Sequence, residues 1–144
     1  MIAIVRLRGE VKTIGKIEHT MQLLNLRTVN NCVVVPDNEK YRGMIRKIKD
    51  HVTYGEINKE TFKKMLIKWG RKGQKRLALK DDEADKIVKE VMDGKKRLKD
   101  FEIKPMFRLH PPRGGYEGIK RPYSLKGALG NRKAAINELL ERMV

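Results

Sequence analysis

Cysteine and long apolar runs are both scarce in this chain. Cys32 is the only cysteine among 144 residues, which excludes an internal disulfide and a multi-cysteine metal site. Its position before three valines predicts a small, buried and inert core residue. No apolar run approaches the roughly 20 residues of a membrane-spanning helix, and residues 1–5 are too few for a signal peptide. We therefore expect a cytoplasmic protein in a reducing compartment, with no membrane partner.

Patterns typical of catalytic and metal sites are also missing. His19, His51 and His110 are scattered, and no H-x-x-x-H, C-x-x-C or paired carboxylate accompanies them. The acidic run at residues 81–85 fits a helix N-terminus, where the helix dipole favours negative charge. Residues 114–118 loosely resemble a phosphate-binding loop but lack its G-K-[ST] ending. We expect no catalytic residue, no cofactor, no metal and no small-molecule substrate.

Acidic residues are too few to balance the basic ones. The chain has 34 Lys and Arg against 18 Asp and Glu, a net charge of +16 and a pI of about 10.1. The excess is greatest in residues 95–133, which carry twelve basic and three acidic side chains. Residues 59–94 are closer to balance, with eleven and seven. A pI above 9 with locally clustered charge is typical of nucleic-acid-binding proteins.

The segment 107–133 combines this charge with glycine, proline and aromatic residues. Between Lys104 and Lys133 only Glu117 is negative. Three prolines and several glycines predict that the segment is neither a regular helix nor a central strand. Its aromatic residues stand beside Lys and Arg, so each tyrosine could stack on unpaired bases or simply pack in the fold. With so few apolar groups, we expect the segment to become ordered against RNA rather than alone.

Hydrophobic periodicity predicts a β-α-β-α-β pattern over the first 57 residues. The expected strands are 2–7, 32–35 and 52–57, and the expected helices run to about residue 25 and over 41–48. Asp37, after Pro36, is a plausible N-cap for the second helix, and a loop should span residues 9–15.

The second half of the chain is expected to be largely helical. Phe62, Met65, Leu66 and Trp69 form one apolar stripe before Gly70, which is more typical of a core face than of an exposed adaptor surface. A basic turn at 71–76 and a helix over 81–92 follow. A strand within 101–109 should lie at a sheet edge because of Pro105, and a short helix should occupy 135–143.

Several sequence blocks resemble the large-subunit ribosomal protein L-thirty family, called L-seven in eukaryotes. The first half carries this resemblance in Asn25-Leu-Arg27 and in residues 41–48 and 52–56. Residues 107–115, 119–123 and 127–132 are similar to the C-terminal extension of archaeal and eukaryotic members. The lack of a long basic N-terminal arm favours the archaeal type.

The resemblance implies an α+β fold. It implies a β-α-β-α-β two-layer core, ferredoxin-like in part, with helices on one face of the sheet, a helical insertion and a basic C-terminal extension. We expect a core over residues 1–58 and an extension over 59–144 packing on the same domain. The extension would comprise two helices, the basic Gly/Pro loop and a terminal helix.

The resemblance also implies a structural constituent of the large ribosomal subunit. Its partners would be ribosomal RNA, with five-S rRNA as a possible neighbour, and adjacent ribosomal proteins. The alternative is an RNA-modifying enzyme or nuclease with a basic substrate groove, which would need an acid/base pair or nucleotide pocket that the sequence does not display. Resemblance and composition together assign RNA contact to Arg42, Lys47, Arg108, His110, Arg113, Tyr116, Lys120, Arg121, Tyr123, Lys126 and Arg132.

Overall fold

The computed structural model describes residues 1–11 and 13–144, and part of the loop expected over 9–15 lies outside them at residue 12. The first half contains β1 (Ile2–Arg6), α1 (Gly15–Leu23), β2 (Asn31–Val35), α2 (Glu39–Ile48) and β3 (Val52–Glu56). The second half contains α3 (Lys59–Trp69), β4 (Arg71–Lys72), β5 (Lys75–Arg76), α4 (Asp81–Met92), β6 (Met106–Arg108), β7 (Gly118–Pro122), β8 (Gly127–Asn131) and α5 (Ile136–Met143). Three 3₁₀ turns are η1 (Leu98–Phe101), η2 (Tyr123–Leu125) and η3 (Lys133–Ala135). The predicted β-α-β-α-β order is confirmed.

Six strands form one mixed sheet in the order β6-β2-β1-β3-β8-β7. β1 is antiparallel to both neighbours, with Ile4 opposite Val33 on β2 and Tyr54 on β3. β6 pairs antiparallel with β2 at one edge, as predicted from Pro105. At the other side, β8 runs parallel to β3 and β7.

The prediction that residues 107–133 contain no central strand is wrong for β8, which lies between β3 and β7. The prolines of the segment stand outside β8, so none of them removes a donor from it. Ala128 and Leu129 on β8 are buried, and these apolar side chains anchor the segment to the core. Gly127 allows the Arg121 backbone to come so close that a Cβ at residue 127 would collide with it. The segment is therefore built into the sheet.

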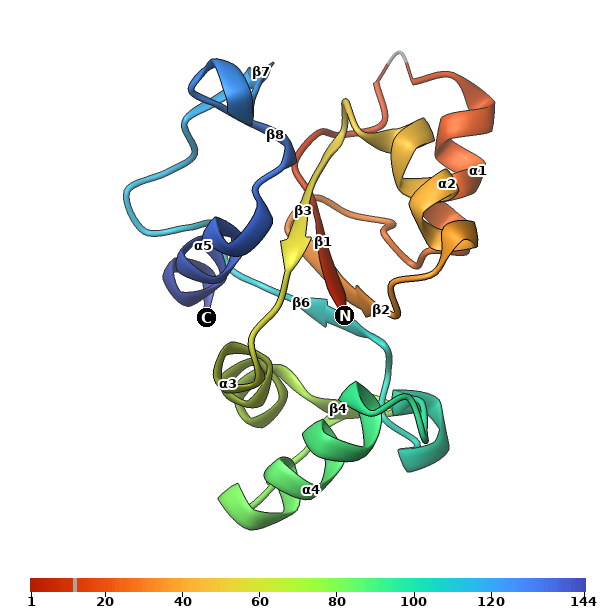
Figure 1. The fold of residues 1–144 in the computed structure, drawn as a ribbon, viewed down its shortest axis with the longest axis vertical. Helices are drawn as coiled ribbons and strands as arrows, with labels where there is room; N and C mark the ends of the chain where they lie inside the picture. The colour runs from red at the N-terminus through yellow and green to blue at the C-terminus, as the bar shows by residue number, and fades with distance from the viewer. Residues whose placement is uncertain (12) are drawn as a thin grey trace.

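Helices cover both faces of the sheet (Figure 1). Ile2 and Ile4 on β1 pack in a cluster with residues of α1 and α2. Ala3 and Val5 pack in a second cluster with residues of α3, α4 and α5. The expectation of helices on one face holds for α1 and α2 but is wrong for the full chain, because α3 and α5 bury the second face. The α+β class itself is confirmed.

The helices agree with the periodicity, except in one capping detail. The Phe62, Met65, Leu66 and Trp69 stripe is buried, as a core face should be. Asn38, not Asp37, occupies the N-cap position of α2, without a side-chain capping bond. Arg42 instead donates to the Asp37 carboxylate through Nε and Nη2, at 2.5 and 2.6 Å. A bidentate arginine is a stronger partner for a carboxylate than a single backbone N–H.

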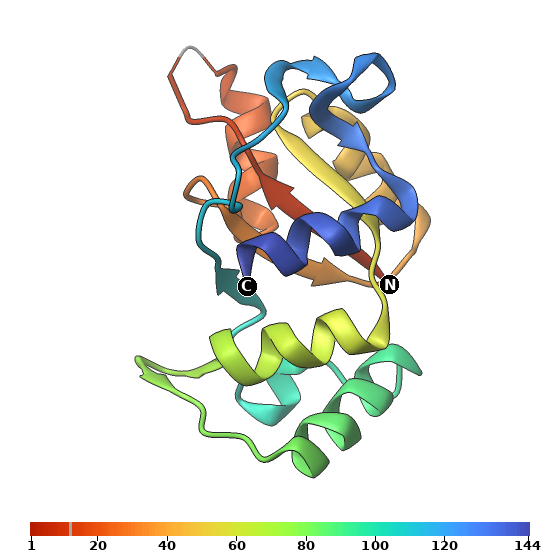
Figure 2. The same cartoon turned by 90° about the vertical axis from the view of Figure 1, so that its left-hand side faces the viewer.

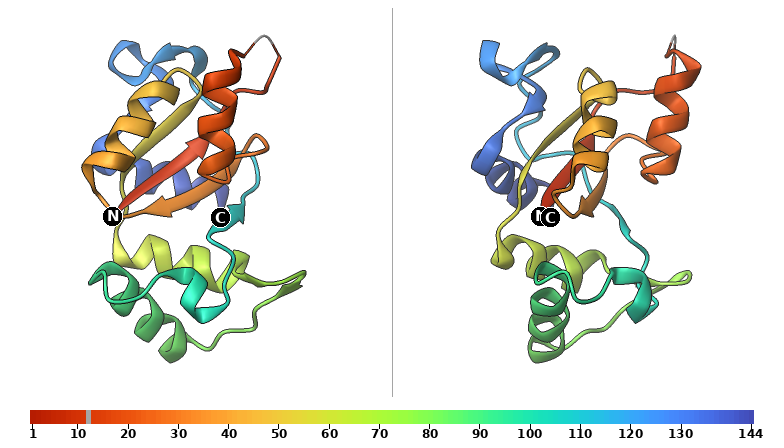
Figure 3. Two further views of the ribbon diagram at one scale, coloured as in Figure 1. Left: turned by 90° about the vertical axis from the view of Figure 1, so that its right-hand side faces the viewer. Right: turned by 45° about the vertical axis from the view of Figure 1, so that its right-hand side comes forward.

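Figures 2 and 3 show two further features of the shape. The chain after β6 climbs along one side of the sheet to β7, and the short β4–β5 hairpin projects from the lower half. Within the described residues, the helices are too short or too polar to cross a membrane.

Candidate nucleic-acid interface

The predicted RNA-contacting residues fall into two groups by exposure. Tyr116 is half-buried and Arg132 is buried at 4% exposure. The others are exposed: Arg42, Lys47, Arg108, His110, Arg113, Lys120, Arg121, Tyr123 and Lys126. An exposed cation can contact an RNA phosphate directly. A buried cation can only affect RNA binding by fixing the position of the residues that it is bonded to.

The β7–β8 lobe, residues 117–132, carries four of the exposed residues. All five residues of β7 are exposed, among them Lys120 and Arg121. Tyr123 lies in η2, and Lys126 follows it in the left-handed conformation at φ 56°. Because β7 is an edge strand with solvent on one side, its cations project from the end of the sheet.

Arg132 holds this lobe to the sheet. Its Nε donates to Thr53 Oγ1 at 3.2 Å, and its Nη2 donates to Glu117 Oε2 at 2.6 Å. Its guanidinium carbon lies 4.8 Å from the centre of the Tyr123 ring. The Arg132 hydrogen bond lowers the pKa of Glu117 below its ordinary 4.5. Glu117, the one acid between Lys104 and Lys133, is thus engaged by Arg132, and the cations around it stay uncompensated.

Tyr116 is held inside the fold. Its hydroxyl donates to Asn30 Oδ1 at 2.7 Å and contacts Met143 Sδ at 3.7 Å. Burial raises the pKa of this phenol above its ordinary value. Of the two readings that the sequence left open for a tyrosine here, the contacts favour packing.

The stretch after β6 runs beside the end of α5. The backbone N–H groups of His110 and Arg113 donate to the carbonyls of Met143 and Arg142, at 3.3 and 3.0 Å. The His110 ring meets Trp69 edge-on, with ring centres 4.8 Å apart. The backbone is therefore fixed while the Arg108 and Arg113 side chains remain exposed.

Sequence reasoning missed a polar groove that joins α2 to the extension. This groove of about 320 Å³ is lined by Arg42 and Arg46 from α2, Tyr54 from β3, and Asn131 and Lys133 beyond. Arg46 lies one helical turn from Arg42 on α2, so the helical spacing was a signal that could have found it. Lys133 had no such signal, because only the pairing of β3 with β8 brings it near Arg42.

Arg6 was also missed, although a charged residue in an apolar strand is itself a signal. It is only 1% exposed, and its Nη1 donates to the carbonyls of Leu26 and Arg27 at 2.8 and 2.6 Å. Arg6 therefore fixes the loop that contains the Asn25-Leu-Arg27 block.

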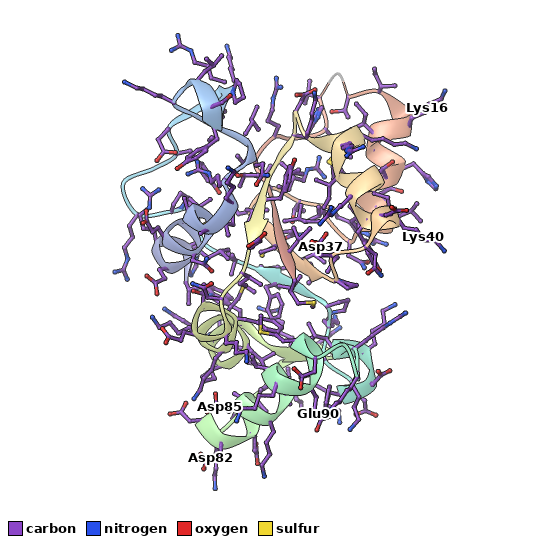
Figure 4. The ribbon with its side chains drawn as sticks, viewed as in Figure 1. Lys16, Asp37, Lys40, Asp82, Asp85 and Glu90 are labelled. Atoms are coloured by element: carbon purple, nitrogen blue, oxygen red, sulfur yellow. The ribbon has the colours of Figure 1, made fainter. Side chains whose placement is uncertain are left out.

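The described residues contain no metal-binding cluster, and the cysteine thiol is unreactive. No group of three or more His, Cys, Asp or Glu is placed to hold a metal among the described residues. Burial raises the pKa of Cys32 to about 12, which keeps its thiol protonated at neutral pH. The acids of α4, such as Asp82 and Asp85, lie at the opposite end of the molecule from β7 (Figure 4). The arrangement is suited to binding a large anion.

Comparison with known proteins gives consistent matches over the chain. The sequence profile of a family described as ribosomal protein L30p/L7e matches residues 2–52. A protein named large ribosomal subunit protein uL30, from Methanococcus vannielii, is 50% identical, with 99% of this chain and 98% of the relative covered. Proteins of the same name from Methanoculleus marisnigri and Methanosphaera stadtmanae are 44% and 39% identical. The alignment with the Methanoculleus marisnigri protein covers 99% of this chain and 99% of the relative. The alignment with the Methanosphaera stadtmanae protein covers 100% of each.

Proposed function

Because this chain belongs to the ribosomal protein L30p/L7e family, we propose that it is a structural constituent of the large ribosomal subunit that binds and stabilises ribosomal RNA. Its similar relatives are archaeal and bear a ribosomal-protein name. It is a ribosomal protein of the cytoplasm rather than an enzyme, and nothing supports the alternative of an RNA-modifying enzyme or nuclease.

The observation that carries the proposal is the uncompensated charge of the extension. Exposed cations on β7 and in the stretch after β6 face solvent, while the single acid among them is paired with buried Arg132. A surface of this kind gains free energy when it meets phosphates and releases their counterions.

Within this function, we assign different roles to the predicted residues. Phosphate contact is proposed for the exposed cations Arg42, Lys47, Arg108, Arg113, Lys120, Arg121 and Lys126, with His110 and Tyr123 beside them. Arg132 and Tyr116 would act indirectly, because they are buried or half-buried and their polar atoms are bonded inside the fold. Their part is to hold the cationic segment in one shape. Arg42 also has a partner, Asp37, but it remains exposed.

The finer partners are also part of the proposal. We propose neighbouring ribosomal proteins as further contacts, and five-S rRNA as a neighbour. The support is the resemblance of residues 41–48, 107–115, 119–123 and 127–132 to the family. Crosslinking in assembled subunits, followed by mapping of the linked nucleotides, identifies the RNA directly.

The first prediction concerns the triple variant Arg113→Ala, Lys120→Ala, Arg121→Ala. We expect weaker binding to large-subunit RNA and a smaller salt dependence, with the slope of log K against log salt falling by about 1 per lost phosphate contact. The thermal midpoint of the free protein should hardly change, since these three side chains are exposed. Filter binding over a salt series and a thermal melt measure both effects.

A matched control is the triple variant Lys59→Ala, Lys86→Ala, Lys89→Ala, which removes the same charge from α3 and α4. It should bind nearly as the wild type does. A wild-type affinity that is flat against salt would contradict the proposal, and a large loss of folding in the first variant would give those residues a structural role.

A further inference from the structure

We propose that the β4–β5 hairpin, residues 71–76, is a second RNA-binding element, and that it holds the phosphate backbone of an RNA double helix. This inference rests on the proposed function, since it names a further part of the same RNA-binding surface. The hairpin belongs to none of the positions assigned above, and it lies outside the acid-poor segment of residues 104–133.

The register of the hairpin places like charges directly opposite each other. Arg71 pairs with Arg76, and Lys72 pairs with Lys75, so both registered pairs consist of two cations. Like charges at directly opposed positions of antiparallel strands destabilise the pairing. An anion bound on one face of the hairpin would offset the repulsion of the cation pair on that face.

The folded chain itself relieves little of this repulsion. Lys72 forms an ion pair with Glu102, which lowers the pKa of that carboxyl. In the part of the chain that the structure describes, Arg71, Lys75 and Arg76 form no ion pair. One acid for four cations leaves the hairpin strongly positive.

The hairpin has a defined orientation on the molecule. The Arg76 guanidinium carbon lies 5.3 Å from the centre of the Trp69 ring, so the arginine pair faces α3. Because successive residues of a strand point to opposite faces, the lysine pair lies on the other face. Gly73 makes the turn at φ 62°, and Figures 2 and 3 show the tip projecting from the body of the protein.

The hairpin is continuous with the proposed interface. The Lys104 backbone N–H donates to the Arg71 carbonyl at 2.9 Å, and the Lys72 and Ile103 backbones form an isolated antiparallel β-bridge. Two residues further along begins β6, with exposed Arg108 at its end. The buried Trp69 ring contacts both Arg76 of the hairpin and His110 of the stretch after β6, so it connects the hairpin to the proposed interface.

The chemistry of the hairpin favours a duplex backbone over unpaired bases. Residues 71–76 include no aromatic side chain on which a base could stack. Trp69 beneath them is only 6% exposed and already contacts Arg76 and His110. Cations without a stacking platform recognise phosphates, and a double helix presents its phosphates outward while its bases stay paired.

The test compares the full-length protein with the variant Lys72→Ala, Lys75→Ala. The probes are a blunt-ended RNA duplex and an oligouridine with the same number of phosphates. For the duplex we expect a several-fold loss of affinity and a salt slope smaller by about 2, or about 1 per lysine. Binding of oligouridine should change much less, and Lys72→Arg, Lys75→Arg should restore duplex binding.

The control Lys86→Ala, Lys89→Ala removes the same charge from α4 and should leave duplex affinity near that of the wild type. Thermal melts should show the hairpin variant folded, since both lysines are exposed. If the wild type binds duplex with a steep salt slope and the hairpin variant matches it, the hairpin inference fails and the proposed function stands. Equal losses on both probes would overturn the duplex assignment. A wild type that binds large-subunit RNA but neither probe would overturn the hairpin inference alone.

Discussion

At the scale of single residues, one amino acid has two opposite roles in this protein. Arg6 and Arg132 are buried, and their donors are used by carbonyls, a hydroxyl and carboxylates. Arg113 and Arg121 are exposed. Arginine suits both roles because its planar guanidinium stays charged and offers five donors in fixed directions. Residue type alone therefore does not distinguish the buried arginines that hold the fold together from the exposed arginines that are available to bind an anion.

The residue-scale prediction concerns Glu117 and pH. Arg132 lowers the pKa of Glu117 in the folded state, so the pair stabilises the fold fully above the ordinary pKa of 4.5. That stabilisation is lost as pH falls from 4.5 through the lowered folded pKa. Glu117→Gln should therefore melt at a lower temperature than the wild type at neutral pH, and the difference should shrink below pH 4.5. Thermal melts over a pH series measure the difference.

A suitable control is Glu56→Gln, which removes an exposed carboxylate at the end of β3 that forms no ion pair among the described residues. Its difference from the wild type should stay nearly constant over the same pH range. A Glu117→Gln difference that grew on acidification would contradict the sign of the linkage.

At the scale of elements, periodicity predicted the helices and most strands, but not the pairing of β3 with β8. Regular spacing of Ile45 and Ile48, or of Phe62 and Trp69, reports which face of a helix is buried. A parallel neighbour more than 70 residues away leaves no such local trace. β8 is short and contains Gly127 and Gly130, so its sequence is typical of a loop. Only the tertiary structure shows that its residues Ala128 and Leu129 are buried in the core.

The element-scale prediction compares two glycines. Gly55 on β3 lies against the Lys133 backbone and Ile136 at the start of α5, so Gly55→Ala must push these elements apart. We expect a destabilisation of about 1–3 kcal/mol, as for overpacking of a core. Gly43 in α2 has open space around its Cβ direction, so Gly43→Ala should stabilise by about 0.5–1 kcal/mol. Urea unfolding followed by circular dichroism gives both values.

The two substitutions add the same methyl group, so their opposite signs isolate the packing of β3 against α5. Stabilisation by Gly55→Ala would show that α5 can move away from the sheet without loss.

At the scale of the whole molecule, the second half of the chain closes a core that the first half begins. Ala3, Val5 and Val34 belong to a cluster completed by α3, α4 and α5. We propose a division into a core over residues 1–58 and an extension over 59–144 that packs on the same domain. The shared cluster supports the proposal that the extension packs on the same domain as the core.

The molecule-scale prediction is a truncation after Asn58. The fragment keeps α1 and α2 on one face of the sheet but leaves Ala3, Val5 and Val34 uncovered on the other. We expect a lower thermal midpoint than that of the full chain and binding of a hydrophobic dye such as anilinonaphthalene sulfonate. A fragment that melts like the full chain and binds no dye would contradict the shared core.

The sequence by itself determined the class of partner, the order of most elements and the family. Composition fixes net charge, and the acid-poor run at 104–133 needs no folding to be recognised. The tertiary structure decided which cations are free. Arg132 reaches Thr53 across 79 positions, and Tyr116 reaches Asn30 across 86. Contacts of such range depend on how the strands pair, and local sequence patterns do not encode that pairing.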